Sequence, residues 1–514
     1  MAVGLALRVW LNVRSQWMID GDEALFGIGT VRLLHGDPPN LLFGVPYMGM
    51  LQSYIAAPFV ALVGPSPLAL RWVTLLASVA FIVTTWLLAR AWYGPSVAAV
   101  AALLAAVPSV YFDAVGLKVW GSYLGVMVLG ALLLLGAWQC RRQGGDMRRK
   151  QWLLLGLICG LALWANLLVA YYVLTALALL PWRQLRRWIG RAVAFGLPGV
   201  LIGGAPLWWY NLRYNGATFR WLFAGAGTAT TNRGAVAHVL FTTLLPRVLG
   251  LTSPWGTIPR GLAATLAALS AAALLLAAYD ALRQVWSGGA ARGEAPAGAA
   301  PLLLFLAVML AVYLLSGFGG PSLSPFDGSG RYLLPVWTAL PLLLAALVVR
   351  LATIWRPIGA LAVAAILATS LAGHRESRAG LVFQSPYWDR LPLNSQPLLE
   401  WLQANDVHDI WLNHWAGDQV MYLSDGTIRS ADYYDIVVGH GINRFPVAFQ
   451  QVDQAPRAAF VIVVGSLPPS GMATRLQALG VTYRGATVGP YQVYVPLSRR
   501  VDPSEVVDAL RYPY

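Results

Sequence analysis

An acidic cluster near the start of the chain is the first place where residue types and spacing could do chemistry. Asp20, Asp22 and Glu23 place three carboxylates in four positions, directly after a first apolar stretch. Only 9 of the first 373 residues are acidic, so this grouping needs a reason. A carboxylate at a membrane edge can act as a general base toward a hydroxyl delivered from the aqueous side. Asp22, with Glu23 beside it, is therefore a candidate catalytic residue; the alternative is that Asp22 only caps a helix and Glu23 complements its dipole.

Basic residues further along the chain are candidates for binding an anionic group. Lys118 is one of only two lysines and lies beside Asp113 where an apolar segment begins. It is either a functional residue or one that reaches the interface or pairs with Asp113. Arg213 and Arg331 can each donate two parallel hydrogen bonds to a phosphate. Further arginines of the same loops could bind lipid headgroups: Arg220, Arg233, Arg247 and Arg260.

The histidines and cysteines carry no metal-binding signature. The six histidines are scattered without paired ligand spacing, and the two cysteines, Cys140 and Cys159, flank a basic loop. A structural zinc, a metalloprotease and a disulfide framework are therefore unsupported. His238 is a weak candidate for contacting substrate or metal, and a solvated loop histidine is the simpler interpretation. A divalent cation as cofactor stays open.

Composition puts these residues in a membrane protein. The chain is 58% hydrophobic and 11% charged, with a mean hydropathy of +0.60, which is typical of polytopic membrane proteins. Residues 1–373 hold 25 Lys+Arg against 9 Asp+Glu, whereas residues 374–514 hold 11 against 13. The basic excess lies in short loops between apolar segments, where the positive-inside bias explains it, so we exclude nucleic acid as a partner.

The fold class expected is an α-helical polytopic membrane protein of about eleven spans. Residues 1–17 are expected to form a short first span that contains Arg8 and Arg14. Two explanations for its shortness stay open: a truncated start of the sequence, or a helix that tilts and thins the bilayer. The other spans are expected near residues 68–90, 95–108, 119–139, 151–166, 167–182, 192–210, 261–282, 299–317, 333–350 and 357–373.

Four basic loops predict the orientation. They are marked by Arg141 to Lys150, Arg183 to Arg191, Arg283 with Arg292, and Arg350 with Arg356. All four fall on one side under this span count, which the positive-inside bias makes the cytoplasm. The acidic cluster, residues 211–258, residues 318–332 and the C-terminal region then lie outside the cytoplasmic (inner) membrane.

The outer loop of residues 18–67 is expected to form two helices along the membrane surface. Asp22 would cap the first, which runs to about Leu34 and stops before Pro38. The second would cover the apolar stretch from Tyr47 to Val63.

Residues 374–514 read as a soluble α/β domain. A helix is expected at Gln396 to Ala404 and a strand at Asp409 to Asn413. A β-branched strand at Ala459 to Gly465 precedes a helix at Thr474 to Leu479. There is no glycine-rich phosphate loop of the Rossmann or Walker type.

Several motifs together resemble the GT-C membrane glycosyltransferases. In chain order they are Asp22-Glu23-Ala24, Pro46-Tyr47-Met48-Gly49, Leu117-Lys118 with Gly121 and Tyr123, Tyr210-Asn211-Leu212-Arg213, Gly216-Ala217-Thr218-Phe219, and Gly330-Arg331-Tyr332-Leu333-Leu334-Pro335. The resemblance is closest to the bacterial enzymes grouped with protein O-mannosyltransferases (glycosyltransferase family 39) and the aminoarabinose transferase of lipid A. It covers most of residues 1–373.

The resemblance implies an inverting enzyme that moves a sugar from a polyprenyl-phosphate-linked donor to a lipid, glycan or protein acceptor at the outer face, among membrane lipids. Asp22 would be the base, with Glu23 beside it, and the substrate contacts would be Lys118, Arg213, Arg331, Tyr332, Tyr47, Gln52 and Tyr123. Gln52 and Gly125 stand where many relatives carry Glu. Two alternatives stay open: a lipid or solute transporter, and a scaffold that binds the donor without turnover.

Overall fold

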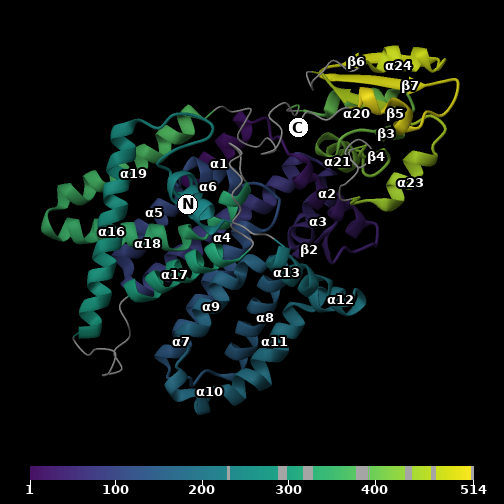
Figure 1. Ribbon diagram of the computed structural model, residues 1–514. Helices are drawn as coiled ribbons and strands as arrows, with labels where there is room; N and C mark the ends of the chain where they lie inside the picture. Colours follow the sequence, from purple (N-terminus) through teal and green to yellow (C-terminus); the bar gives the residue numbers. More distant parts are fainter. Residues whose placement is uncertain are drawn as a thin grey trace.

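The computed structural model describes residues 1–228, 232–286, 298–316, 328–377, 392, 394–433, 443–464 and 471–510. A helical region precedes a small sheet domain (Figure 1). Much of the expected outer loop at 318–332 lies outside the described residues.

The helical region contains nineteen α-helices among its described residues. The first nine are α1 (Ala2–Arg14), α2 (Gly21–Leu34), α3 (Leu51–Val63), α4 (Pro67–Tyr93), α5 (Pro95–Ala106), α6 (Val110–Gly116), α7 (Tyr123–Arg142), α8 (Arg149–Ala165) and α9 (Ala170–Leu179). The others are α10 (Leu185–Arg191), α11 (Leu197–Gly203), α12 (Ala205–Arg213), α13 (Ala217–Thr228), α14 (Arg233–Val239), α15 (Leu245–Leu249), α16 (Arg260–Trp286), α17 (Ala299–Leu315), α18 (Val336–Ile354) and α19 (Arg356–Glu376). A 3₁₀ helix, η5 (Gly328–Leu333), leads into α18.

The membrane-spanning helices begin and end close to the apolar stretches of the sequence. Five described helices are long and apolar enough to cross a membrane: α4, α7, α16, α18 and α19. The number is up to seven if each of two bent pairs counts as one span. These pairs are Pro95–Ala106 with Val110–Gly116, and Leu167–Leu179 with Trp182–Gly203. The helical membrane fold is confirmed, and the total of eleven spans stays a prediction.

The first outer helix starts with a different cap from the one predicted. The N-cap of α2 is Asp20, whose side chain accepts the Glu23 N–H at 3.0 Å, while Glu23 accepts the Asp20 N–H at 3.2 Å. A capping box needs partners three positions apart, and Asp20 with Glu23 has that spacing whereas Asp22 lies inside the first turn. The prediction that Asp22 caps this helix was wrong, and its end at Leu34 was right.

The second outer helix is shorter than predicted. Tyr47 lies in strand β2 (Val45–Gly49), which pairs antiparallel with β1 (Leu41–Leu42), and α3 begins only at Leu51. Gly44, with φ +74°, allows the tight turn between the strands. Apolar composition alone does not distinguish such a hairpin from a helix start.

The sheet domain confirms the α/β prediction for the C-terminal region. Its described elements are α20 (Gln396–Ala404), β3 (Asp409–Trp411), α21 (His414–Leu423), β4 (Arg429–Ala431), α23 (Pro446–Gln454), β5 (Ala459–Val463), α24 (Met472–Ala478), β6 (Tyr483–Val488) and β7 (Tyr491–Pro496). The strand order is β4-β3-β5-β7-β6, parallel from β4 to β5 and antiparallel from β5 to β6. Apolar clusters cover both faces of this sheet.

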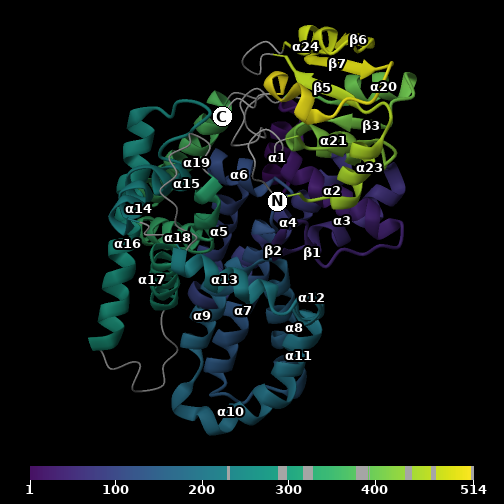
Figure 2. The same ribbon diagram turned by 45° about the vertical axis from the view of Figure 1, so that its right-hand side comes forward.

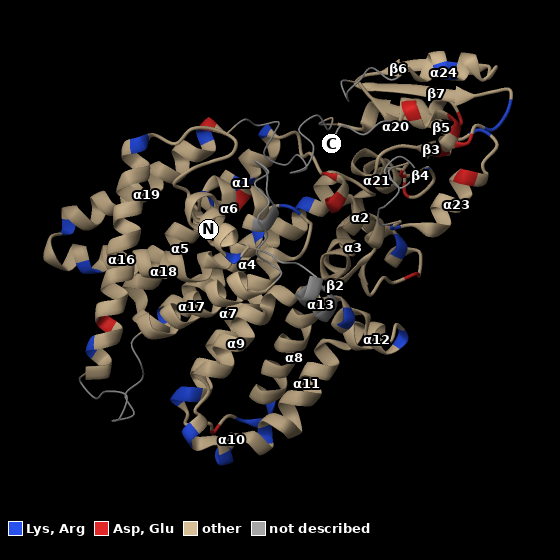
Figure 3. Cartoon of the chain, in the orientation of Figure 1, with Lys and Arg blue, Asp and Glu red and all other residues tan. Residues whose placement is uncertain are grey.

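The sheet domain rests directly on the outer loop through α21. A Cβ added to Gly21 of α2 would lie 2.8 Å from the Trp415 Cα, so the two backbones are in close contact. The Tyr422 hydroxyl donates to the Ser66 carbonyl at 3.0 Å and accepts the Ser66 N–H at 3.1 Å. Figures 1 and 2 show the sheet domain beside α2 and α10 at the opposite end. Lysines and arginines gather around α10 (Figure 3).

Candidate active site

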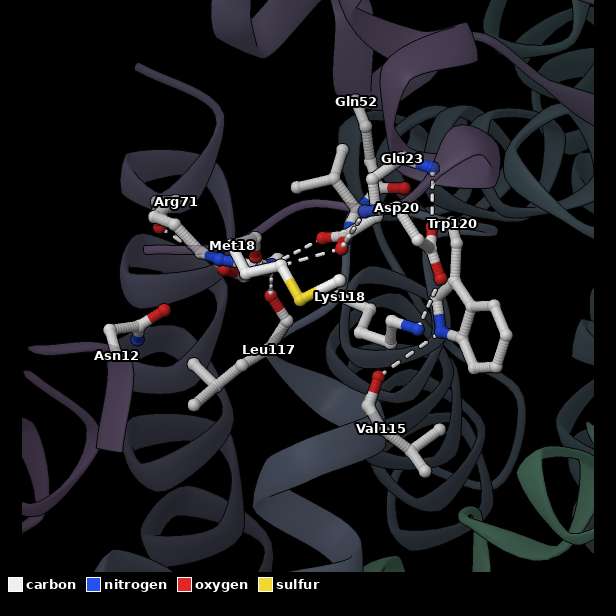
Figure 4. Close-up of polar contacts among 12 residues, drawn as sticks. Asn12, Met18, Asp20, Glu23, Gln52, Arg71, Val115, Leu117, Lys118 and Trp120 are labelled. Carbon is white, nitrogen blue, oxygen red and sulfur yellow. Dashed lines mark hydrogen bonds and ion pairs between the residues drawn. The ribbon is translucent and has the colours of Figure 1, made fainter. Parts of the chain in front are cut away.

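Glu23 lies at the centre of a buried network at the start of α2 (Figure 4). Its carboxylate is fully buried and forms an ion pair with Arg71 of α4, which is equally buried. It also accepts the Val119 N–H at 3.0 Å, in addition to the Asp20 N–H of the capping box. Arg71 donates to the Leu117 carbonyl at 2.6 Å. Glu23 therefore ties α2 to α4 and to the segment after α6, and both of its oxygens are occupied.

Lys118 forms a buried ion pair with Asp20. Neither structural alternative from the sequence holds, because Lys118 is 4% exposed and Asp113 has other partners. Asp113 pairs with Arg8 at 2.9 Å and with the His374 Nε2 at 3.1 Å. Burial raises the pKa of the Asp20 carboxyl to about 6, while the charge of Lys118 acts in the opposite direction.

Trp120 is a platform for two cations. The Lys118 Nζ lies 4.5 Å from the centroid of the indole ring and the Arg331 guanidinium carbon lies 4.8 Å from it. Arg331 also donates to the Tyr332 hydroxyl at 3.2 Å. Cation–π contacts of this kind hold a guanidinium in place without consuming all of its N–H donors. Arg331 comes from η5 and Lys118 from the segment just after α6, so the platform joins two parts of the helical region.

Asp22 is the member of the acidic cluster that keeps an accessible carboxylate. Its side chain is 22% exposed, whereas those of Asp20 and Glu23 are 0% exposed. Its charge acts on Tyr47 of β2, together with that of Arg331. The pKa of the Tyr47 hydroxyl is raised, mainly by burial and also by its neighbour Tyr332, to which it is hydrogen-bonded.

Tyr123 and Gln52 are the last two residues of the group around Asp22. We call this group the Asp22 cluster: Asp22, Tyr47, Gln52, Tyr123, Arg331 and Tyr332. The ring of Tyr123 lies 6.1 Å from that of Trp120 and 6.3 Å from that of Tyr332. The Gln52 Oε1 accepts the N–H groups of Gly121 at 3.2 Å and of Ser122 at 2.9 Å. Gly121 and Ser122 have positive φ values, so Gln52 stabilises a turn that the backbone would not adopt easily.

Comparisons with known proteins show what the fold of this chain is similar to. A model of the family described as dolichyl-phosphate-mannose-protein mannosyltransferase matches residues 47–210. The structure of ArnT from Cupriavidus metallidurans bound to undecaprenyl phosphate superposes with a TM-score of 0.60 at 13% identity, covering 97% of each chain. The apo form of that ArnT gives a TM-score of 0.57 at 14% identity, covering 96% of each chain.

An oligosaccharyltransferase from Archaeoglobus fulgidus, solved with zinc and sulfate, gives a TM-score of 0.52 at 13% identity. That match covers 97% of this chain and 74% of the other. The comparison with curated proteins gave no match. The chain therefore has the GT-C fold of these solved structures, and at identities of 13 to 14% the likeness shows the fold alone.

One predicted substrate contact, Arg213, lies away from the candidate site. Arg213 is exposed at the end of α12, and none of the hydrogen bonds or ion pairs of the described residues joins it to the Asp22 cluster. Its neighbours reach the cluster instead. The Thr218 hydroxyl donates to the Pro46 carbonyl at 2.6 Å, and the Trp221 ring stacks on Tyr47 at 4.1 Å.

Three residues of the candidate site were missed in the sequence. Arg71 had a signal, because a charged residue inside a 27-residue apolar helix needs a partner. Trp120 had none, since tryptophans are frequent throughout the chain. Arg444 comes from the sheet domain, and its Nη2 lies 4.0 Å from the Asp22 Oδ1. No pattern in the sequence near Arg444 or near Asp22 indicates that the two residues lie close together.

Within the described part of the chain, no three His, Cys, Asp or Glu side chains lie close enough together to hold a metal ion.

Proposed function

We propose that this GT-C protein is an inverting glycosyltransferase that moves a sugar from a polyprenyl-phosphate donor to an acceptor hydroxyl. The observation that carries the proposal is the division of roles in the acidic cluster. Asp20 and Glu23 are held in buried ion pairs, while Asp22 keeps an accessible carboxylate, and its charge and that of Arg331 both act on Tyr47. The undecaprenyl phosphate in the ArnT structure supports a lipid-linked phosphate as the donor's leaving group.

The reaction would be a single displacement. The acceptor oxygen attacks the anomeric carbon, its proton passes to the Asp22 carboxylate, and the bond from that carbon to the phosphate oxygen breaks. The electron pair of that bond leaves with the polyprenyl phosphate. The phosphate is already a stable anion, so it needs cationic stabilisation more than a general acid. Arg331, held on Trp120, would supply this stabilisation.

In this proposal Glu23 positions the base and does not itself take the proton, because Arg71 and two backbone N–H groups occupy its oxygens. Gln52 similarly holds the turn at Gly121. An amide oxygen accepts two N–H groups as a carboxylate does, so a Gln at this position keeps the turn and does not argue for an inactive scaffold.

The acceptor would arrive at the outer face of the cytoplasmic membrane. The arginine-rich end at α10 marks the cytosolic side by the positive-inside bias (Figure 3). The sheet domain, at the opposite end beside α2, would then be extracytoplasmic and next to Asp22 (Figures 1 and 2). The acceptor would be a lipid, a glycan or a protein.

The test of this proposal is Asp22→Asn in proteoliposomes that contain a polyprenyl-phosphate sugar and a mixture of envelope acceptors. We expect kcat to fall by at least about a hundredfold, because the proton acceptor is lost, while the melting temperature stays within the experimental spread. Transfer would be followed with a radiolabelled sugar. Asp37→Asn is the matched control, since Asp37 lies in the same loop but is 65% exposed and pairs with Arg32.

Full transfer by Asp22→Asn would contradict the base assignment. A wild-type protein that binds donor lipid but never releases polyprenyl phosphate would favour the scaffold, and one that moves the intact donor across the bilayer would favour the transporter.

A further inference from the structure

Arg444 of the sheet domain is held against the hairpin that follows α2. It precedes α23, and its Nη1 donates to the Phe43 carbonyl at 3.1 Å. The next residue, Phe445, packs its ring 4.9 Å from that of Phe43. These two contacts join positions about 400 residues apart in the chain. They fix where the Arg444 guanidinium can reach.

That guanidinium faces Asp22 without closing on it. The Arg444 Nη2 lies 4.0 Å from the Asp22 Oδ1, and the side chains are 19% and 22% exposed. Charged hydrogen bonds between a guanidinium and a carboxylate are normally 2.7 to 2.9 Å long. The separation therefore gives Asp22 an orienting cation while leaving its oxygens able to accept a proton.

Arg444 is also surrounded by charges of its own domain. Its charge lowers the pKa of His414 and of Asp418 in α21, and the charge of Asp22 raises the pKa of Asp418. Asp418 is 5% exposed, and its Oδ2 has no hydrogen-bond partner in the described part of the chain. The charge of Arg444 thus acts on the Asp418 side chain of α21, while its Nη2 lies 4.0 Å from the Asp22 Oδ1.

We propose that Arg444 is a positioning residue for Asp22, so that the sheet domain completes the active site of the helical region. The inference rests on the proposed role of Asp22 as base. A carboxylate that must receive a proton in the transition state has to be ionised and aimed, and an opposite charge at this distance favours both. Without the sheet domain, Asp22 would lose this cation.

The test compares Arg444→Gln with Arg444→Lys in the full-length protein in proteoliposomes. For Arg444→Gln we expect kcat to fall about 10- to 100-fold with the donor KM changed less than threefold, because misaligning a base by about 1 Å has effects of this size. Arg444→Lys should recover most of kcat, since it keeps the cation. Arg457→Gln, an exposed arginine of the same domain, is the matched control.

A purely structural role would give a different pattern. Phe445→Leu weakens the contact with Phe43 and leaves the charge in place, so we expect it to keep most of kcat. If Phe445→Leu is as slow as Arg444→Gln, or if Arg444→Lys recovers nothing, Arg444 only docks the domain and the inference is wrong.

The inference can fail separately from the proposed function. An inactive Asp22→Asn beside a normal Arg444→Gln would overturn the role of Arg444 and leave Asp22 as base. An active Asp22→Asn would overturn both.

Discussion

At the scale of single residues, the candidate site separates the charges that form buried ion pairs from the accessible carboxylate of Asp22, the proposed base. Arg71 with Glu23 and Lys118 with Asp20 are buried pairs that neutralise each other at the start of α2. Removing one member of such a pair is strongly destabilising, because the other charge is left buried. These pairs fix the backbone around Asp22, which stays accessible.

Lys118→Met tests the structural part of this arrangement. We expect a loss of about 3 to 5 kcal/mol in the free energy of unfolding, because Asp20 would be left without its cation. The double variant Asp20→Asn with Lys118→Met should recover much of this loss, since Asn removes the charge and still serves as an N-cap. Thermal unfolding in detergent is the measurement. A double variant no more stable than the single one would contradict the prediction, and an unchanged donor KM in it would limit Lys118 to this structural role.

At the scale of elements, the packing of α2 against α21 positions Asp22, the proposed base. Gly21 is the first residue of α2, and its missing side chain lets the α21 backbone approach. The helix that carries Asp22 and the helix that carries Asp418 are therefore in direct backbone contact.

Gly21→Ala tests this contact. Alanine normally favours a helix over glycine by about 1 kcal/mol, but here its Cβ would lie 2.8 Å from the Trp415 Cα and 2.9 Å from the His414 carbonyl oxygen. We expect a lower melting temperature and faster proteolysis between the helical region and the sheet domain. Gly190→Ala in α10 is the control, because nothing lies within 4 Å of its added Cβ. Equal stabilisation by both substitutions would refute the close packing.

At the scale of the whole molecule, the helical region and the sheet domain meet at the candidate site. The sheet domain covers the outer loop, contributes Arg444 to the surroundings of Asp22, and lies at the end opposite to the basic loop at α10. We expect the stability of the sheet domain to depend on pH, because α21 contains two titratable side chains, Asp418 and His414.

Burial raises the pKa of Asp418 from its ordinary value near 4 to about 7. The folded state therefore keeps a proton that the unfolded chain has lost, and stability falls as pH rises from about 4 to 7. For His414, burial lowers the pKa but the hydrogen bond and charge of Asp432 raise it more. Its stabilising contribution is complete below about 6.5 and is lost as pH rises through the raised pKa.

Asp418→Asn should remove the first of these two effects. We expect a higher melting temperature at pH 8, with a gain of up to roughly 4 kcal/mol, and little gain at pH 4. Unfolding of the full-length protein, followed by scanning fluorimetry between pH 4 and 8, checks this. Asp425→Asn, at a half-exposed position of the same domain, is the control for the loss of a carboxylate. A pH-independent gain would contradict the argument.

Local patterns predicted the elements well. Residues 151–166 were expected as a span and form α8 at Arg149–Ala165, and α20 covers Gln396–Ala404 as expected. Hydropathy and caps act over a few residues, so a short window contains the information needed. The same locality explains the two errors: Asp22 was one of several acidic residues that could cap, and Tyr47 began an apolar run that a hairpin fits as well as a helix.

The sequence by itself determined that the chain crosses a membrane, which loops are basic, and that a carboxylate cluster follows the first helix. Only the tertiary structure decided which carboxylate stays accessible. Arg71 reaches Glu23 over 48 positions and Lys118 reaches Asp20 over 98, while Arg444 comes from a separate domain. The physical reason is that an ion pair depends on the distance between two side chains, and this distance is set by how the helices and the sheet domain pack, not by residue spacing.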